Sequence, residues 1–168
     1  IIESSETHIL GRGNRYESDI QKGNDRGYRY INKNKGGGAA NKLSADTNME
    51  EVRRQSYDYY KNALCNGMHI AYLVLAEKQI VGTGGVSFFQ VMPTYHNPSG
   101  KKAYIMNMYT KPLYRRKGIA YKTLDMLVTE AKRKGITAIS LEATDMGRPL
   151  YEKYGFTKMK DEMELPNE

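Results

Sequence analysis

The chain has 168 residues, of which 39% are hydrophobic, and its 26 Lys and Arg against 19 Asp and Glu give a net charge of +7. This length suits one compact domain, alone or with an extension, rather than two full domains. The single cysteine, Cys65, excludes an internal disulfide framework and a multi-cysteine zinc site, and without a signal-peptide pattern or a long apolar run we expect a cytoplasmic protein with no membrane partner.

Residues 1–47 form a first segment that shows no sustained hydrophobic period and holds seven of the sixteen glycines. Such a segment buries too little apolar surface to offset its ordering entropy. We expect an irregular or divergent N-terminal segment here, followed by a folded domain over residues 48–168. Its only candidates for a docked strand are Ile1, Ile2, Ile9 and Leu10. Because Arg, Lys, Tyr and Gly interleave over residues 11–38, a nucleic-acid-binding module remains an alternative.

A helix is predicted to begin at Thr47 or Asn48, since either side chain can cap it. Gly67 ends this helix. Its buried stripe is expected at Val52, Tyr57, Tyr60 and Leu64.

Three strands are predicted next. The β-rich runs at 69–76 and 79–92 are joined by Glu77 and Lys78, which predicts an antiparallel hairpin. A polar loop then leads to a third strand over residues 103–110.

A second helix follows Gly118, because apolar residues recur there with helical spacing, and Gly135 is placed to end it. Its buried face is expected at Ile119, Leu124, Leu127, Val128 and Ala131. Since a strand at 137–144 comes next, the strand–helix–strand order predicts two parallel neighbours. A short helix at 145–155 and two strand-like runs over 156–165 complete the chain. The pattern predicts a mixed α/β fold.

The loop before the second helix is unusually basic. Arg115, Arg116 and Lys117 stand at a helix N-terminus, where the helix dipole favours anions. The first backbone N–H groups of a helix lack internal partners, and a glycine such as Gly118 lets a phosphate approach them. The loop therefore predicts a phosphate-bearing ligand. The motif GxxxxGK[ST] is absent, and GTGGVS at 82–87 lacks a third glycine and a following helix.

Two motifs in this region resemble those of the GNAT N-acetyltransferase superfamily. The stretch MNMYTKPLYRRKGIA looks like its acetyl-CoA signature, in which an Arg or Gln is followed by two residues, a Gly, one residue, and a Gly or Ala. Those positions are Arg115, Gly118 and Ala120. The second hallmark appears as LYEKYGF, with Tyr151, Gly155 and Phe156. The resemblance covers roughly residues 48–165. It implies a GNAT-like acyl-CoA N-acyltransferase fold with a central βαβ unit and flanking antiparallel strands.

The resemblance implies acetyl-CoA as cosubstrate, with no metal. Backbone amides from about Arg116 to Ala120 would hold the pyrophosphate, and the pantetheine arm would pair like an added strand with residues 108–110. The implied cosubstrate-binding residues are Met108, Tyr109, Thr110, Arg115, Arg116, Lys117, Gly118, Ile119, Ala120 and Tyr121.

The resemblance also assigns catalytic roles. Tyr151 is the implied acid for the coenzyme sulfur, and a backbone N–H near Met108 is the oxyanion donor. Many relatives carry a Glu on the strand before the phosphate loop, but AYIMNMYT has none. Glu142 is then the catalytic candidate for the base, with Asp145, His96 and a water chain left open. Residues expected to contact the acceptor are Asn107, His96 and Asp145.

We therefore expect an N-acetyltransferase that moves an acetyl group to a primary amine of a small molecule or peptide, by direct attack in a ternary complex. No nucleic-acid partner is expected for this enzyme, and edge strands near the C-terminus could pair in a homodimer. A non-catalytic acetyl-CoA sensor is the other alternative, because the strand lacks a carboxylate.

Overall fold

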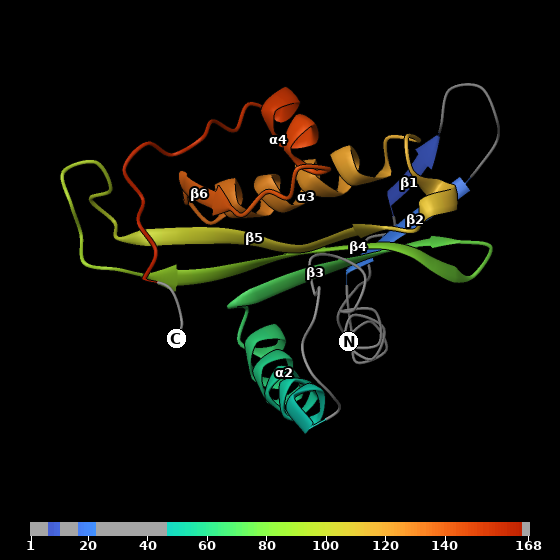
Figure 1. Ribbon diagram of the computed structural model, residues 1–168, viewed down its shortest axis with the longest axis horizontal. Helices are drawn as coiled ribbons and strands as arrows, with labels where there is room; N and C mark the ends of the chain where they lie inside the picture. The colour runs from blue at the N-terminus through green and yellow to red at the C-terminus, as the bar shows by residue number, and fades with distance from the viewer. Residues whose placement is uncertain (1–6, 11–16, 23–46, 166–168) are drawn as a thin grey trace.

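The computed structural model describes residues 7–10, 17–22 and 47–165. These residues form a six-stranded sheet whose strands follow one another in chain order. The strands are β1 (Thr7–Leu10), β2 (Glu17–Lys22), β3 (His69–Ala76), β4 (Gln79–Gln90), β5 (Lys101–Thr110) and β6 (Ala138–Leu141). The helices are α2 (Thr47–Cys65), α3 (Ile119–Arg133) and α4 (Arg148–Tyr154), with a 3-10 turn at Pro112–Tyr114. Helices α3 and α4 cover one face of the sheet, and α2 lies on the other (Figure 1).

The main core lies between α3 and the sheet. The predicted face of this helix is confirmed, since Ile119, Leu124, Leu127, Val128 and Ala131 are all buried. They pack in one cluster with side chains of β3, β4 and β5, including Val74, Val81, Val86 and Ile105. Parallel pairing of β5 with β6 is also confirmed. The strand–helix–strand unit predicted from the sequence therefore organises this half of the molecule.

The β3–β4 hairpin is confirmed as well, with Ala76 paired to Gln79 across a two-residue turn. Glu77 and Lys78 have φ angles of 49° and 63°. Both values fall in the left-handed region that the favoured two-residue hairpin turns require. Strand β3 is buried along almost its whole length, so the hairpin forms the centre of the sheet.

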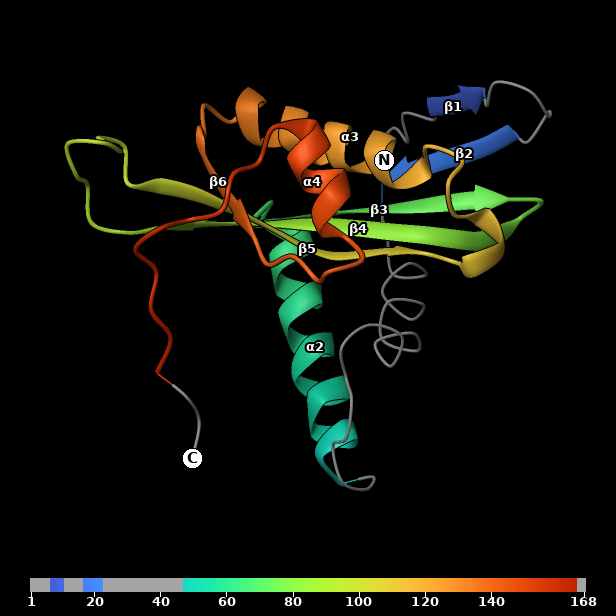
Figure 2. The same ribbon diagram turned by 45° about the horizontal axis from the view of Figure 1, so that its top comes forward.

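Helix α2 begins at Thr47, as expected, but its predicted stripe is partly wrong. Val52 and Tyr57 are exposed, and Tyr60 belongs to a small core with Ala71 and Leu73 of β3. Val52 is exposed because only the C-terminal part of α2 meets the sheet. The first turns of the helix extend away from it (Figure 2).

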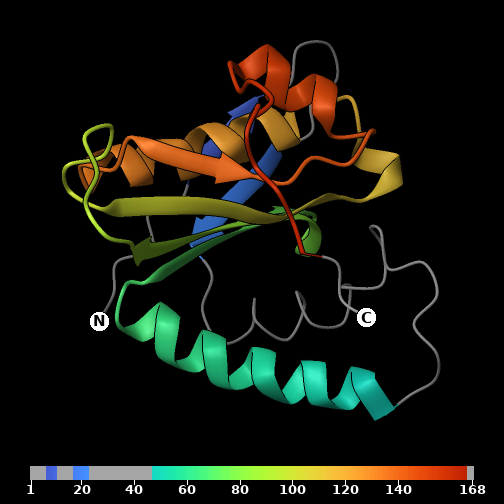
Figure 3. The same cartoon turned by 60° about the vertical axis from the view of Figure 1, so that its left-hand side comes forward.

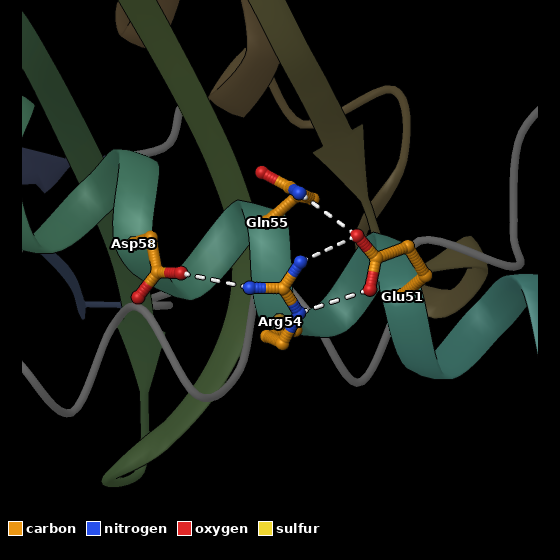
Figure 4. Close-up of polar contacts among 4 residues, drawn as sticks. All are labelled: Glu51, Arg54, Gln55 and Asp58. Atoms are coloured by element: carbon orange, nitrogen blue, oxygen red, sulfur yellow. Dashed lines mark hydrogen bonds and ion pairs between the residues drawn. The ribbon is translucent and has the colours of Figure 1, made fainter.

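The exposed part of α2 is stabilised by its own charges. Arg54 donates two hydrogen bonds to the Glu51 carboxylate, at 2.9 and 2.6 Å, and lies 3.7 Å from Asp58 (Figure 4). These hydrogen bonds, with one from Gln55, lower the pKa of Glu51 to about 2. Ion pairs between residues three or four positions apart stabilise a solvent-exposed helix, so these turns can form although Val52 does not pack in the core.

The N-terminal segment contributes more structure than the sequence predicts. Strand β1 contains Ile9 and Leu10, which were strand candidates, whereas Ile1 and Ile2 lie outside the described residues. Strand β2, ESDIQK, was not predicted. It pairs with β3 over Asp19–Lys22, because an unpaired strand edge offers a row of main-chain groups to any extended segment.

The C-terminal end contains less regular structure than the sequence predicts. Strand β6 has four residues, and the two strand-like runs predicted over 156–165 are wrong, since those residues form no strand. In Figure 3 this segment passes as an irregular chain from α4 across the end of the sheet. No helix in the described part of the chain is long and apolar enough to span a bilayer.

Candidate active site

An opening forms where β5 and β6 stop pairing. The parallel ladder runs from Lys102 opposite Ala138 to Ile105 opposite Leu141. Strand β6 ends there, whereas β5 continues through Thr110. Residues 106–110 therefore pair with β4 on one side and have no strand among the described residues on the other.

A β-bulge lies at the start of this opening. Met106 is opposite Gly85 and Tyr109 is opposite Thr83, so two residues of β5 face the single Gly84. One of the two is Asn107, whose φ of 54° is left-handed. A bulge bends its strand and increases the local twist. It therefore accounts for the divergence of β5 from β6 immediately after Ile105.

The bulge also decides which main-chain groups face the opening. The N–H of Lys111 donates to the Val81 carbonyl of β4 at 2.8 Å. Because main-chain groups alternate between the two edges of a strand, those of Tyr109 face β4 as well. The N–H and C=O groups of Met108 and Thr110 then point into the opening.

The loop after β5 leads into the N-terminus of α3. Pro112 starts a 3-10 turn, and Arg116 and Gly118 have φ angles of 62° and 80°. A Cβ on Gly118 would meet no atom within 4 Å, so the space in front of it is open. Helix α3 has no side-chain cap and no acid in its first turn. The first N–H groups of α3 are thus available to an anion.

The three cations of this loop are exposed. Arg115 folds back so that its Nε donates to the Thr110 carbonyl at 3.1 Å. The Lys117 ammonium lies 5.1 Å from the centre of the Tyr114 ring. The loop therefore concentrates positive charge at the end of β5, beside the free helix terminus.

Tyr151 lies on α4, the helix that follows β6. Its side chain is 8% exposed and contacts Phe156, with ring centres 6.2 Å apart. Burial raises the pKa of the phenol, so it stays protonated at neutral pH. Its hydroxyl makes no hydrogen bond to another described residue. Tyr154, by contrast, donates to Asp125 of α3 at 3.1 Å, which fits a packing role.

Residues 39–156 match the model of the Acetyltransferase (GNAT) family. The chain belongs to this family. No curated protein sequence matches the chain.

Solved structures agree with this assignment. A predicted acetyltransferase from Clostridium acetobutylicum, determined with acetyl-CoA, has 33% identity and a TM-score of 0.79 over 89% of this chain and 96% of its own. A GCN5-related N-acetyltransferase from Ralstonia eutropha has the same fold, with 20% identity, a TM-score of 0.78, and 89% and 98% coverage. Glucosamine-6-phosphate N-acetyltransferase from Arabidopsis thaliana also shares it, with 20% identity, a TM-score of 0.62, and 90% and 99% coverage. The predicted GNAT-like fold is confirmed.

The acid candidates of this GNAT chain lie beyond the end of β6. Glu142 is exposed and accepts a hydrogen bond from the phenol of Tyr104 on β5. Burial and this bond raise the pKa of Tyr104 to about 12. Asp145 is fully exposed and lies 3.8 Å from Arg148. Both acids thus lie on the chain that leaves the opening.

His96 is not brought to the opening. It lies on the loop between β4 and β5, at the start of β5, where its exposed ring contacts Tyr95. The basic loop is at the other end of β5 (Figure 1). Ten residues of strand separate the two ends by roughly 30 Å. The structure therefore gives no support to the expected contact between His96 and an acceptor in the opening.

Sequence reasoning missed a polar cluster between α2 and the sheet. The Tyr59 hydroxyl and Ser87 Oγ lie 3.2 and 2.9 Å from Nδ1 of His69, which is 2% exposed. Burial lowers the pKa of His69 to about 4, so its ring is neutral. The amide of Asn107 donates to the Tyr60 hydroxyl at 2.6 Å. No sequence signal links these residues, because they come from separate elements.

Proposed function

We propose that this GNAT protein transfers the acetyl group of acetyl-CoA to a primary amine of a small molecule or peptide. The observation that carries the proposal is the uncapped N-terminus of α3, preceded by a basic loop and placed beside an opening between two parallel strands. The diphosphate of the coenzyme would bind the N–H groups from about Arg116 to Ala120. Gly118 would allow its close approach, and the three loop cations would offset its charge.

The pantetheine arm would lie along the open edge of β5. Main-chain groups of Met108 and Thr110 point there, so a peptide-like chain can add to this edge as an extra strand. Such pairing uses main-chain hydrogen bonds, so it does not depend on which side chains stand at these two positions. It would bring the thioester to the bulge, next to the N–H of Met108. The site fits acetyl-CoA through backbone groups that are unpaired by strand or helix.

The chemical step would be direct attack in a ternary complex. The neutral amine nitrogen bonds to the thioester carbon, the C–S bond breaks, and the thiolate takes a proton from the phenol of Tyr151. Donation from the Met108 N–H would stabilise the negative oxygen in between. The proton lost by the amine would pass to Glu142 or to water. Tyr151 suits its role because burial keeps the phenol protonated.

The acceptor would enter from the side of the opening that Asn107, Glu142 and Asp145 border. The two acids are exposed and can attract an ammonium group before it loses its proton. His96 has no part in this proposal because of its position.

Calorimetry with acetyl-CoA is the first test, and detection of released thiol with a panel of amines and peptides is the second. We expect saturable binding, followed by thiol release with at least one amine. Binding without any turnover would favour the sensor alternative. Absence of binding at millimolar acetyl-CoA would overturn the proposal.

A further inference from the structure

We infer that the hydrogen bond from Asn107 to Tyr60 holds the β5 bulge in the shape that aims the Met108 N–H at the thioester carbonyl. Both are then positioning residues, because neither touches the reacting atoms. The inference rests on the proposed function, and it adds helix α2 to the parts that shape the reaction centre.

Asn107 adopts a conformation that needs support. Its φ of 54° lies in the left-handed region, which is unfavourable for residues other than glycine, although asparagine tolerates it best. Two hydrogen bonds fix the residue from opposite ends. Thr83 Oγ1 donates to its carbonyl at 2.9 Å, and its own Nδ2 donates to the Tyr60 hydroxyl at 2.6 Å.

Tyr60 is a rigid anchor for this contact. Its side chain is 2% exposed, and its ring lies edge-on to Tyr59 and His69, with centres 5.4 and 5.1 Å apart. These neighbours leave the phenol little freedom to follow a moving strand. The contact therefore ties the bulge to a fixed point on α2, across 47 positions of sequence.

The anchored residue Asn107 is bonded directly to Met108, whose N–H would stabilise the reacting oxygen. Met108 follows Asn107 directly, and its side chain turns to the opposite face of the sheet, towards Thr123 of α3. The peptide between Asn107 and Met108 carries the N–H that faces the opening. A rotation of Asn107 would turn this N–H away, and small errors in donor placement are costly in catalysis.

A matched pair of variants separates positioning from simple stabilisation. Tyr60→Phe removes the hydroxyl that Asn107 contacts. Tyr72→Phe is the control: Tyr72 is 4% exposed, and its hydroxyl donates to Glu130 of α3 at 2.8 Å rather than to a residue of the bulge. Each variant removes the hydroxyl of a buried tyrosine, so we expect similar falls in Tm. Only Tyr60→Phe should alter the reaction centre.

The measurement is the infrared carbonyl stretch of bound acetyl-CoA labelled with carbon-13 in the acetyl group, which needs no acceptor. Wild-type protein and Tyr72→Phe should shift this band to lower wavenumber than in free acetyl-CoA, as a hydrogen-bond donor does. Tyr60→Phe and Asn107→Ala should return it towards the free value, while the Kd measured by calorimetry is unchanged. With an amine acceptor, both should lower kcat by ~10-fold or more and leave the KM for acetyl-CoA unaltered.

The double variant tests whether the two residues act through one contact. Tyr60→Phe combined with Asn107→Ala should have no larger effect on the band than either change alone. Additive effects, or a wild-type band in both single variants, would overturn the inference while leaving the proposed function intact. If wild-type protein binds no acetyl-CoA, the proposed function itself fails.

Discussion

Gly84 lies directly beside the Met108 side chain, so that a Cβ on Gly84 would stand 2.7 Å from the Met108 sulfur and equally close to Cγ2 of Thr123. No real Cβ occupies such a position without movement of its neighbours. Because Gly84 of β4 has no Cβ, the bulge on β5 can turn the Met108 side chain towards α3.

Gly84→Ala should therefore destabilise the fold by about 1–3 kcal/mol, the usual cost of overpacking a core. Chemical denaturation with urea would measure this loss. Thr123→Ser removes the methyl group nearest to the new Cβ, so Gly84→Ala should cost less in a Thr123→Ser background. If the two changes are additive, steric contact with Thr123 is not the cause.

Gly118→Ala should weaken acetyl-CoA binding, because a Cβ would stand where the diphosphate approaches the N-terminus of α3. Loss of one hydrogen bond to a charged group corresponds to a rise in Kd of ~10-fold or more. Gly135→Ala is the matched control, since Gly135 ends the same helix with a φ of 71° and has equally open surroundings. Both variants carry similar backbone strain. Equal affinities of the two for acetyl-CoA in calorimetry would refute the assigned diphosphate position.

Tyr151→Phe should lower kcat by roughly 10²-fold, the lower range for loss of a general acid, without a change in the Kd for acetyl-CoA. The buried phenol of wild-type protein has a raised pKa, so its protonated form should persist through pH 9. Tyr154→Phe loses its bond to Asp125 and serves as the control. A loss of coenzyme affinity in Tyr151→Phe, with kcat preserved, would assign Tyr151 to binding instead.

His69 should make stability depend on pH. Its pKa of about 4 in the folded state lies below the ordinary value of 6.5, so between these values the unfolded chain binds the proton and the folded chain does not. Stability is then lost as pH falls from 6.5 to about 4, by about 3 kcal/mol in total. Denaturation midpoints across this range should fall less steeply in His69→Gln.

The sequence was sufficient for the elements whose pattern depends on local spacing. The apolar face of α3 was predicted from its helical period, and the β3–β4 hairpin from two β-rich runs joined by two residues, because both signals lie in consecutive residues. The basic loop was predicted for a similar reason, since Arg115 to Gly118 are adjacent to the helix that they precede. The two family motifs then identified the correct superfamily, which the family match confirms.

Features that depend on distant partners were not predictable. ESDIQK of β2 has no apolar alternation, and its pairing comes from the edge of β3. Val52 and Tyr57 were assigned to a buried stripe because sequence spacing does not reveal how much of a helix meets the sheet. The contact of Asn107 with Tyr60 depends on a bulge, and the polar side chain of Asn107 gives no hint of either.

The turn at Glu77 and Lys78 shows where this protein could be improved without disturbing its function. Two L-residues hold left-handed φ angles there, although Asn-Gly is the pair that such turns prefer. Replacing this solvent-exposed pair by Asn-Gly should raise the free energy of unfolding, and it changes no residue of the candidate active site.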